Sequence, residues 1–217
     1  MSVDGLVFSR DGRTVFAAGG GLTALDVATG RVLWADPDPF ASCVDLLPHP
    51  DGDRLVAVGP CGVVTLHDAA TGAMLWRRPQ PSNSLNTVAV SCDGRSILVG
   101  GFRPFGAILE ADGATRATLP LERGMYLNGA SFAPDDATVV TVDSEGGVAL
   151  WSVADGRPVR AFGKANLQPN DAAFTPDGRR LVVVTCSGSV VVFDVATGEV
   201  AAKWKAHRAS ASSVVVR

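Results

Sequence analysis

Two turn signals recur along this chain with the same period. An Asp-Gly pair occurs at Asp11-Gly12, Asp51-Gly52, Asp93-Gly94 and Asp177-Gly178, and Asp135-Asp136 holds the same place in one further copy. The successive first residues of these pairs are 40, 42, 42 and 42 positions apart. A glycine later in each copy recurs with nearly the same period, at Gly30, Gly72, Gly113, Gly156 and Gly198. A period in the 40s indicates either a ring of small β-sheets or an array of helices.

The last complete copy distinguishes these two architectures. Residues 170–205 contain four short apolar runs separated by three turns, one of which is Pro176-Asp177-Gly178. Runs such as Leu181-Val182-Val183-Val184 are typical of buried strands, and Pro and Gly supply the backbone angles of tight turns. The copy lacks the 3.6-residue periodicity of a helix. Each copy therefore predicts a four-stranded antiparallel sheet.

A single sheet of this size cannot bury both of its faces, whereas radial stacking of several sheets does so. We therefore predict an all-β chain forming one β-propeller domain over residues 1–217. Its five four-stranded antiparallel blades are expected at about residues 3–36, 44–79, 85–120, 127–163 and 170–206.

Residues 212–217 are predicted to be the first strand of a sixth blade, so the ring is expected to be incomplete. Either the chain is part of a larger propeller or another chain completes the ring. The open flanks would expose apolar faces and strand edges, which favour self-association. The alternative is a ring of five blades, with the last strand lying across the seam.

Composition narrows the possible partners. The net charge is −3 and charged residues make up 19% of the chain, so the basic surface expected for nucleic-acid binding is missing. No apolar run approaches the roughly 20 residues that cross a bilayer, and the first residues do not resemble a signal peptide. We therefore expect a soluble cytoplasmic protein with no membrane partner.

Cysteine and histidine spacing gives no metal motif. Four cysteines and three histidines are scattered, at Cys43, Cys61, Cys92, Cys186, His49, His67 and His207. Zinc sites need closely spaced ligands, and no such spacing occurs. We expect buried free thiols, no metal and no cofactor.

Two segments of the repeat resemble those of the WD40 family and its bacterial propeller relatives. Because the repeat recurs along the sequence, the resemblance covers essentially the whole chain. One is the run before the second strand, at Val7–Gly12, Phe132–Asp136 and Phe174–Gly178; the other is the end of the third strand, at Leu150–Ser152 and Val192–Asp194. The resemblance implies a propeller that serves as a protein-interaction scaffold. The family's Gly-His pair has one partial counterpart, Ala206-His207, and its Asp between the second and third strands is missing from most copies. The side-chain network of a standard WD40 blade is therefore not expected.

The first two copies also resemble the tryptophan-docking repeat of quinoprotein dehydrogenases. The matching residues are Ala24, Asp26, Gly30 and Trp34, and again Leu66, Asp68, Gly72 and Trp76. In that family the tryptophan packs against the neighbouring blade. The third and fourth copies lack it, and Trp204 in the fifth is displaced by two residues. The resemblance leaves an alternative function open, that of a dehydrogenase dependent on pyrroloquinoline quinone. Such enzymes have more blades, act after secretion and need calcium ligands that this sequence does not display.

A polar series occurs in the strand of each blade that should line the central channel. It consists of Asp4, Asn86, Asn128 and Asn170, and Val44 interrupts it. Either these residues form a polar ring that binds a small ligand or a peptide end, or they cap the strand entrance and meet channel water.

The loops that share one face of a propeller are the second candidate site, because loops on a rigid scaffold are common recognition sites. The third and fourth copies place aromatic and arginine residues there, namely Phe102, Arg103, Phe105, Arg123 and Tyr126. Such residues are enriched at binding hot spots, although they could equally cap the edge of the core.

No catalytic constellation is apparent. The G-x-S-x-G motif is absent, and Gly19-Gly20-Gly21 reads as a hairpin turn because no helix follows it. We therefore predict a non-catalytic scaffold that binds a protein or peptide partner.

Overall fold

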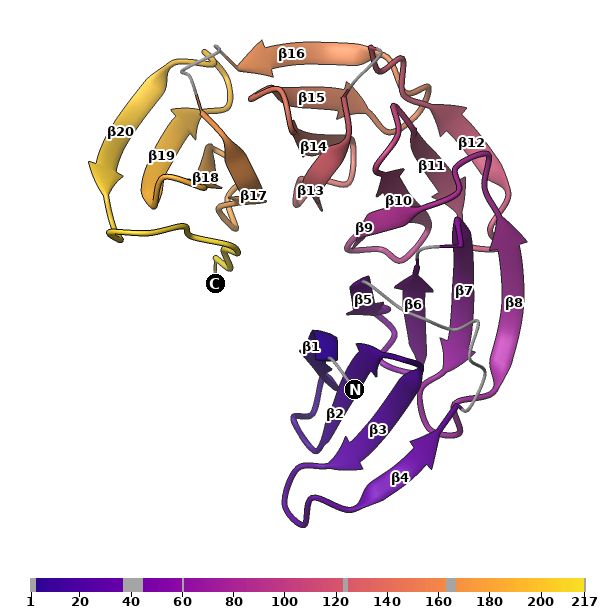
Figure 1. Cartoon of the computed structure of the whole chain (residues 1–217). Coiled ribbons are helices and arrows are strands. Elements are labelled where there is room, and N and C mark those ends of the chain that lie inside the picture. Colours follow the sequence, from indigo (N-terminus) through magenta and orange to yellow (C-terminus); the bar gives the residue numbers. More distant parts are fainter. Residues whose placement is uncertain (1–2, 37–44, 60, 123–124, 163–166, 217) are drawn as a thin grey trace.

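The computed structural model of this chain describes all residues except 1–2, 37–44, 60, 123–124, 163–166 and 217 (Figure 1). The described residues form five four-stranded antiparallel sheets, each built from four consecutive strands hydrogen-bonded in chain order. This confirms the all-β prediction and the five blades. The described part of the chain has no helix long and apolar enough to cross a membrane.

The strands follow one another in the same order in every blade. Blade 1 contains β1 (Val3–Phe8), β2 (Thr14–Gly19), β3 (Leu22–Asp26) and β4 (Val32–Ala35). Blade 2 contains β5 (Asp45–Pro48), β6 (Arg54–Val58), β7 (Val63–Asp68) and β8 (Met74–Pro79). Blade 3 contains β9 (Leu85–Val90), β10 (Ser96–Gly101), β11 (Gly106–Glu110) and β12 (Thr115–Thr118). Blade 4 contains β13 (Leu127–Phe132), β14 (Thr138–Asp143), β15 (Val148–Ser152) and β16 (Pro158–Phe162). Blade 5 contains β17 (Pro169–Phe174), β18 (Arg180–Thr185), β19 (Ser189–Asp194) and β20 (Val200–Lys205).

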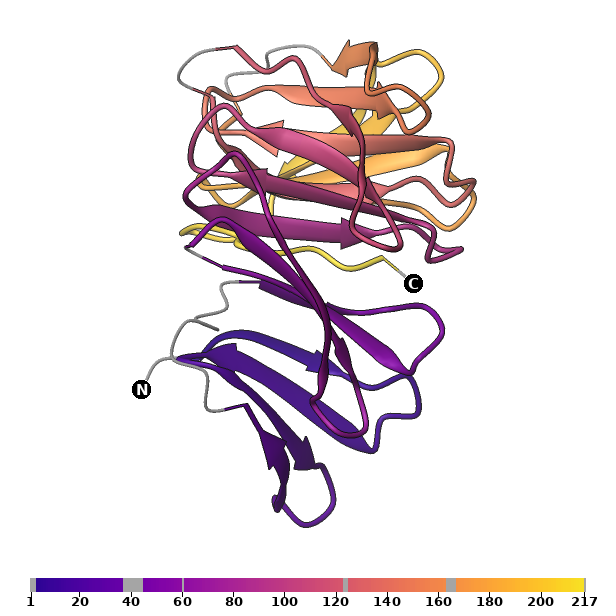
Figure 2. The same cartoon turned by 90° about the vertical axis from the view of Figure 1, so that its right-hand side faces the viewer.

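The blades are arranged as an open arc around a central axis. The first strand of each blade lies nearest the centre and the fourth lies at the rim (Figure 1). Blades 1 and 5 stand at the two ends of the arc, with a gap between them, so the ring is not closed. The side view shows the sheets of neighbouring blades stacked face to face (Figure 2).

Apolar clusters between the sheets hold neighbouring blades together. Between blades 2 and 3, for example, Val56, Val64 and Leu66 pack with Ile97 and Val99. Similar clusters join the other neighbouring pairs. Because blade 3 is covered on both sides, every residue of β10 is buried. The hydrophobic effect therefore acts mainly between blades, as the repeat predicts.

The turns between first and second strands are linked from one blade to the next. Asp136 replaces the repeated glycine in blade 4 and keeps its left-handed backbone, with a φ of 57°. Its carboxylate accepts the backbone N–H groups of Cys92 (2.7 Å) and Asp93 (2.9 Å) in the turn of blade 3. A ring nitrogen of buried His49 likewise lies 2.8 Å from the Gly94 carbonyl oxygen. The departure from the Asp-Gly pattern thus adds a contact between blades.

Asp136 provides a test of this contact. Asp136→Ala is expected to destabilise the protein by about 2 kcal/mol, because two charge-assisted hydrogen bonds are lost and the left-handed backbone remains strained. Asp136→Gly should lose roughly 1 kcal/mol less, since glycine adopts this backbone without strain. Urea denaturation of the two variants measures the difference. Equal losses would show that the left-handed backbone at residue 136 costs alanine no more than glycine.

Two expectations from the sequence need correction. Cys61, Cys92 and Cys186 are free but exposed, because they lie in turns and not in strands, so the expectation of buried thiols is wrong for them. Cys43 lies outside the described residues. The chain forms no strand over residues 206–216, so the predicted first strand of a sixth blade is not present as a strand.

Candidate functional site

The asparagine series on the inner strands connects blade 3 to blade 4, blade 4 to blade 5, and blade 5 to the C-terminal segment. Each side-chain amide donates a hydrogen bond to a backbone carbonyl 41 residues further along the chain. The Nδ2–O distances are 2.7 Å from Asn86 to Leu127, 2.9 Å from Asn128 to Pro169, and 2.8 Å from Asn170 to Ala211. Leu127 and Pro169 are the first residues of β13 and β17. The amides of Asn86 and Asn128 therefore serve contacts between blades, and that of Asn170 holds the C-terminal segment against blade 5. Asp4 lies in β1, but its side chain lies outside the described part of the chain.

Two aspartates, one position after this series, make a second contact of the same kind. The Asp45 carboxylate accepts the backbone N–H of Val88 at 3.0 Å. The Asp171 carboxylate accepts the backbone N–H of Val214 at 3.0 Å and the Ser213 hydroxyl at 3.0 Å. We did not predict either residue. Their separation of 126 positions, three times the 42-residue period, is the sequence signal that could have revealed them.

Burial changes the acidity of both carboxyl groups. Desolvation raises the pKa of Asp45 to about 6; the N–H groups of Val88 and Leu46 oppose this, and the charge of Asp171 adds to it. Burial also raises the pKa of Asp171. The inner edge of the arc thus carries two carboxylates whose charged forms are disfavoured.

A third set of contacts joins the blades at the rim. The indole Nε1 of Trp34 donates to the Ala69 carbonyl at 3.0 Å, and that of Trp76 to the Ala111 carbonyl at 3.3 Å. This confirms the docking implied by the quinoprotein resemblance. In blade 4 the equivalent residue is Arg160, whose guanidinium donates to the carbonyls of Ala196 and Thr197, each at 2.9 Å. Arg160 could not be recognised from the sequence, because the docking motif is defined by its tryptophan.

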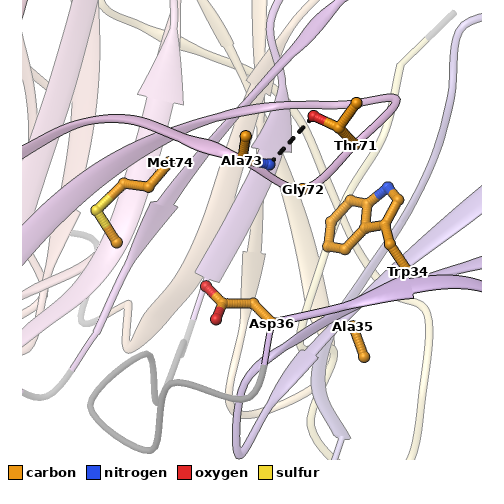
Figure 3. A pocket seen from close by; sticks show the side chains of 7 residues that line it. All are labelled: Trp34, Ala35, Asp36, Thr71, Gly72, Ala73 and Met74. Carbon is orange, nitrogen blue, oxygen red and sulfur yellow. Dashed lines mark hydrogen bonds between the residues drawn. The ribbon is translucent and has the colours of Figure 1, made fainter.

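A shallow cavity of about 320 Å³ lies beside the docked Trp34, between blades 1 and 2 (Figure 3). Its lining includes the Trp34 ring, Asp36, Gly72 and Met74. The Ala73 N–H donates to the Thr71 hydroxyl at 3.3 Å and closes the turn over which the indole lies. We interpret this cavity as the rim of a contact between blades.

The loop face of blades 3 and 4 brings two of the predicted aromatic residues together. Phe102, in the turn between β10 and β11, and Tyr126, just before β13, have ring centroids 5.7 Å apart and ring planes inclined at 48°. Phe102 is 55% exposed and Tyr126 is 36% exposed. The backbone N–H of Ser144, in the next turn, donates to the Tyr126 carbonyl at 3.0 Å, and the Tyr126 N–H donates to the Ser144 hydroxyl at 3.3 Å. Phe102 and Tyr126 therefore form a solvent-accessible aromatic surface held by hydrogen bonds to the neighbouring turn. We call this pair the aromatic face.

The other predicted members of this site differ in placement. Arg103 is exposed next to Phe102. Phe105 is partly buried and packs against the core between blades 2 and 3, so it caps that core. Arg123 lies outside the described residues. A depression of about 400 Å³, lined by Ser144, Glu145, Leu167, Gln168 and Ser187, continues the same side of the molecule toward blade 5.

A comparison with protein families gives one match. The PQQ_2 family model, described as "Outer membrane protein assembly factor BamB", matches residues 2–162, which is 161 of the chain's 217 residues. No curated protein matches the chain.

Proposed function

Because the chain belongs to this family of quinoprotein-like β-propellers, we propose that it is a non-catalytic scaffold that binds a protein or peptide partner on the aromatic face. The observation that carries the proposal is the exposed pair of Phe102 and Tyr126, with the exposed Arg103 following Phe102 in the same turn. Aromatic and arginine side chains dominate binding energy at protein interfaces. The name of the matched model describes an assembly factor, which supports a protein partner in general.

The inner strands support a scaffold over the alternative of a quinone-dependent dehydrogenase. Asn86, Asn128 and Asn170 use their side-chain N–H groups, and Asp45 and Asp171 their carboxylates, in contacts with the backbone of the chain. A catalytic site at the axis would need polar groups directed at a substrate. We therefore expect that adding pyrroloquinoline quinone and calcium to the protein produces no dye-linked oxidation of an alcohol.

The proposal also includes a cytoplasmic location, as composition suggests, and self-association through the open flanks. The turns that resemble those of WD40 repeats are compatible with a scaffold, because they reflect a repeat that propellers share. None of these points is needed for partner binding on the aromatic face.

The binding proposal is tested with peptides selected from a display library against the 217-residue protein. Replacing Phe102 by Ala or Arg103 by Glu should weaken the selected peptides at least tenfold, as expected for loss of a hot-spot side chain. Neither change should alter stability by more than about 0.5 kcal/mol, since both residues are exposed. Arg123→Glu is the second charge reversal in the set. Leu33→Ala, at a rim residue that is also 55% exposed, is the matched control.

Retention of peptide affinity in both Arg103→Glu and Phe102→Ala would exclude this face as the binding site. Equal loss in Leu33→Ala would point to non-specific binding to exposed apolar residues.

A further inference from the structure

The depression between blades 4 and 5 occupies the same place in the repeat as the aromatic face between blades 3 and 4. Both members of the aromatic face have a counterpart 42 positions further along the chain. Ser144 is the counterpart of Phe102, and Gln168 is the counterpart of Tyr126. The flanking strands agree, because β14 and β15 follow β10 and β11 at the same offset of 42 residues. The two places are therefore equivalent gaps between blades that are lined by different side chains.

Smaller side chains explain why the gap between blades 4 and 5 is hollow. Phe102 and Tyr126 fill their gap with two rings whose centroids are 5.7 Å apart. Ser144 and Gln168 carry no ring, and the gap that they line is a depression of about 400 Å³. The depression therefore has room for a side chain of a bound segment.

Hydrogen bonds connect the depression to the aromatic face. Ser144 lines the depression, and it exchanges two hydrogen bonds with Tyr126 of the aromatic face. The next blade repeats one of these contacts, since the Cys186 N–H donates to the Gln168 carbonyl at 2.8 Å. Blades 3, 4 and 5 follow one another in the arc (Figure 1). A segment that binds the aromatic face and continues toward blade 5 therefore passes over the depression.

The two gaps differ in charge as well as in shape. Glu145 is the counterpart of Arg103, so the charged residue of the turn changes from a base to an acid over one repeat. Glu145 is exposed and is the one charged residue among the described residues that line the depression. Within the described part of the chain it forms no ion pair. The Lys205 ammonium donates instead to the backbone carbonyl of Ser187. The depression therefore favours a cationic group.

The turn that carries Glu145 is fixed before any partner binds. The carboxylate of buried Asp143 accepts the N–H groups of Glu145 and Gly147, both at 2.9 Å. The turn also fits closely against blade 5, because a Cβ at Gly146 would lie 2.3 Å from the Leu167 carbonyl oxygen. Binding at Glu145 therefore does not have to order this backbone, which lowers its entropic cost.

We infer that the partner segment bound on the aromatic face continues toward blade 5 and places a lysine or arginine side chain in the depression, where it pairs with Glu145. The inference rests on the proposed function, because the aromatic face supplies the anchor. The Ser144 and Ser187 hydroxyls and the Gln168 amide oxygen are further acceptors for an ammonium or guanidinium group. The segment thus combines an apolar or aromatic anchor with a basic residue, and Glu145 selects among segments by charge.

Selection from a random peptide display library, run on two forms of the 217-residue protein, tests the inference. On the wild type we expect peptides that carry lysine or arginine at a fixed spacing from an aromatic or aliphatic residue. On Glu145→Lys we expect aspartate or glutamate at that position, because the charge in the depression is reversed. Recovery of the same sequences on both proteins would overturn the inference.

Affinities of the peptides selected on the wild type measure the ion pair. At low salt, Glu145→Gln should weaken binding about threefold, as for an exposed ion pair, and Glu145→Lys at least tenfold. Both losses should shrink at high salt, because salt screens exposed charges. Replacing the basic residue of the peptide by glutamate should restore binding to Glu145→Lys. Losses that do not depend on salt would contradict an ion pair.

Glu199→Lys is the matched control. It makes the same charge reversal at an exposed residue in the turn between β19 and β20, at the opposite end of the strands. It should change binding by less than about twofold, because a distant exposed charge is screened. Melting temperatures should be unchanged in all three variants, since the replaced side chains are exposed. A loss in Glu199→Lys equal to that in Glu145→Lys would overturn the inference.

The proposed function and this inference fail in different ways. If Phe102→Ala weakens the selected peptides and Glu145→Lys changes neither their sequences nor their affinity, the inference is overturned and the aromatic face remains the binding site. If Glu145→Lys reverses the selected charge and Phe102→Ala has no effect, the depression takes a basic residue as inferred, and the aromatic face alone is contradicted.

Discussion

Replacing Gly72 by alanine is expected to destabilise the protein by about 3 kcal/mol, whereas Gly30→Ala should cost only about 1 kcal/mol. The two glycines occupy the same position of the repeat and have nearly the same backbone, with φ of +75° and +70°. Alanine is strained in this left-handed backbone at both positions. At Gly72 its Cβ would lie 2.6 Å from the Trp34 ring, whereas nothing lies within 4 Å at Gly30. The difference therefore measures how tightly Trp34 is docked.

Chemical denaturation of the two variants provides the measurement, and Trp34→Ala completes a double-mutant cycle. Trp34→Ala alone should cost about 3 kcal/mol, since it removes the indole packing and the bond to Ala69. With Trp34 removed, Gly72→Ala should cost no more than Gly30→Ala, about 1 kcal/mol. Additive losses, or equal losses at Gly30 and Gly72, would contradict docking of the indole on the turn.

Asp45→Asn is expected to change the pH dependence of stability by about 3 kcal/mol. Burial raises the pKa of Asp45 from 3.8 to about 6, so the native state binds its proton more tightly than the unfolded chain does. The stability due to this carboxyl group is thus fully present below pH 3.8 and is lost as pH rises through 6. Asparagine does not titrate, so the stability of Asp45→Asn relative to the wild type should increase as pH rises across this range.

The free energies of unfolding of both proteins at pH 3.5 and pH 7.5 test this expectation, because other carboxylates cancel in the difference. Asp177→Asn is a control of opposite sign. The Thr175 hydroxyl lowers the pKa of Asp177, so its contribution is present above pH 3.8 and lost as pH falls. If the stability of the wild type relative to Asp45→Asn instead increases between pH 4 and 7, the Asp45 carboxylate is better stabilised than its burial indicates.

The repeat predicted the blades because turn residues and β-branched runs act locally. Asp-Gly pairs favour tight turns because glycine accepts a left-handed backbone, so their period indicated the architecture without any knowledge of packing. The docking of Trp34 and Trp76 was predictable from the resemblance to the quinoprotein repeat, in which the tryptophan packs against the neighbouring blade. The role of Arg160 was not, because an arginine on an outer strand is ordinarily a solvated side chain.

The inner contacts show where local information ends. The Asn86, Asn128 and Asn170 series was visible, but the direction of each amide depends on where the next blade lies. Asp45 and Asp171 were hidden, because Thr87 and Gly129 hold the same position in the blades between them. Proximity between Phe102 and Tyr126 could be anticipated from adjacent blades, whereas burial of Phe105 depends on the core beneath it.

Native-state hydrogen exchange of the 217-residue protein tests most directly whether the arc of blades is open at blade 5. The account predicts the slowest amides in β10, which is buried along its whole length, and rapid exchange at Val215, whose N–H lies at an edge without a second strand. Val214 should exchange more slowly than Val215, because its N–H is bonded to Asp171. Protection at Val215 equal to that in β10 would show a closed ring and contradict the account.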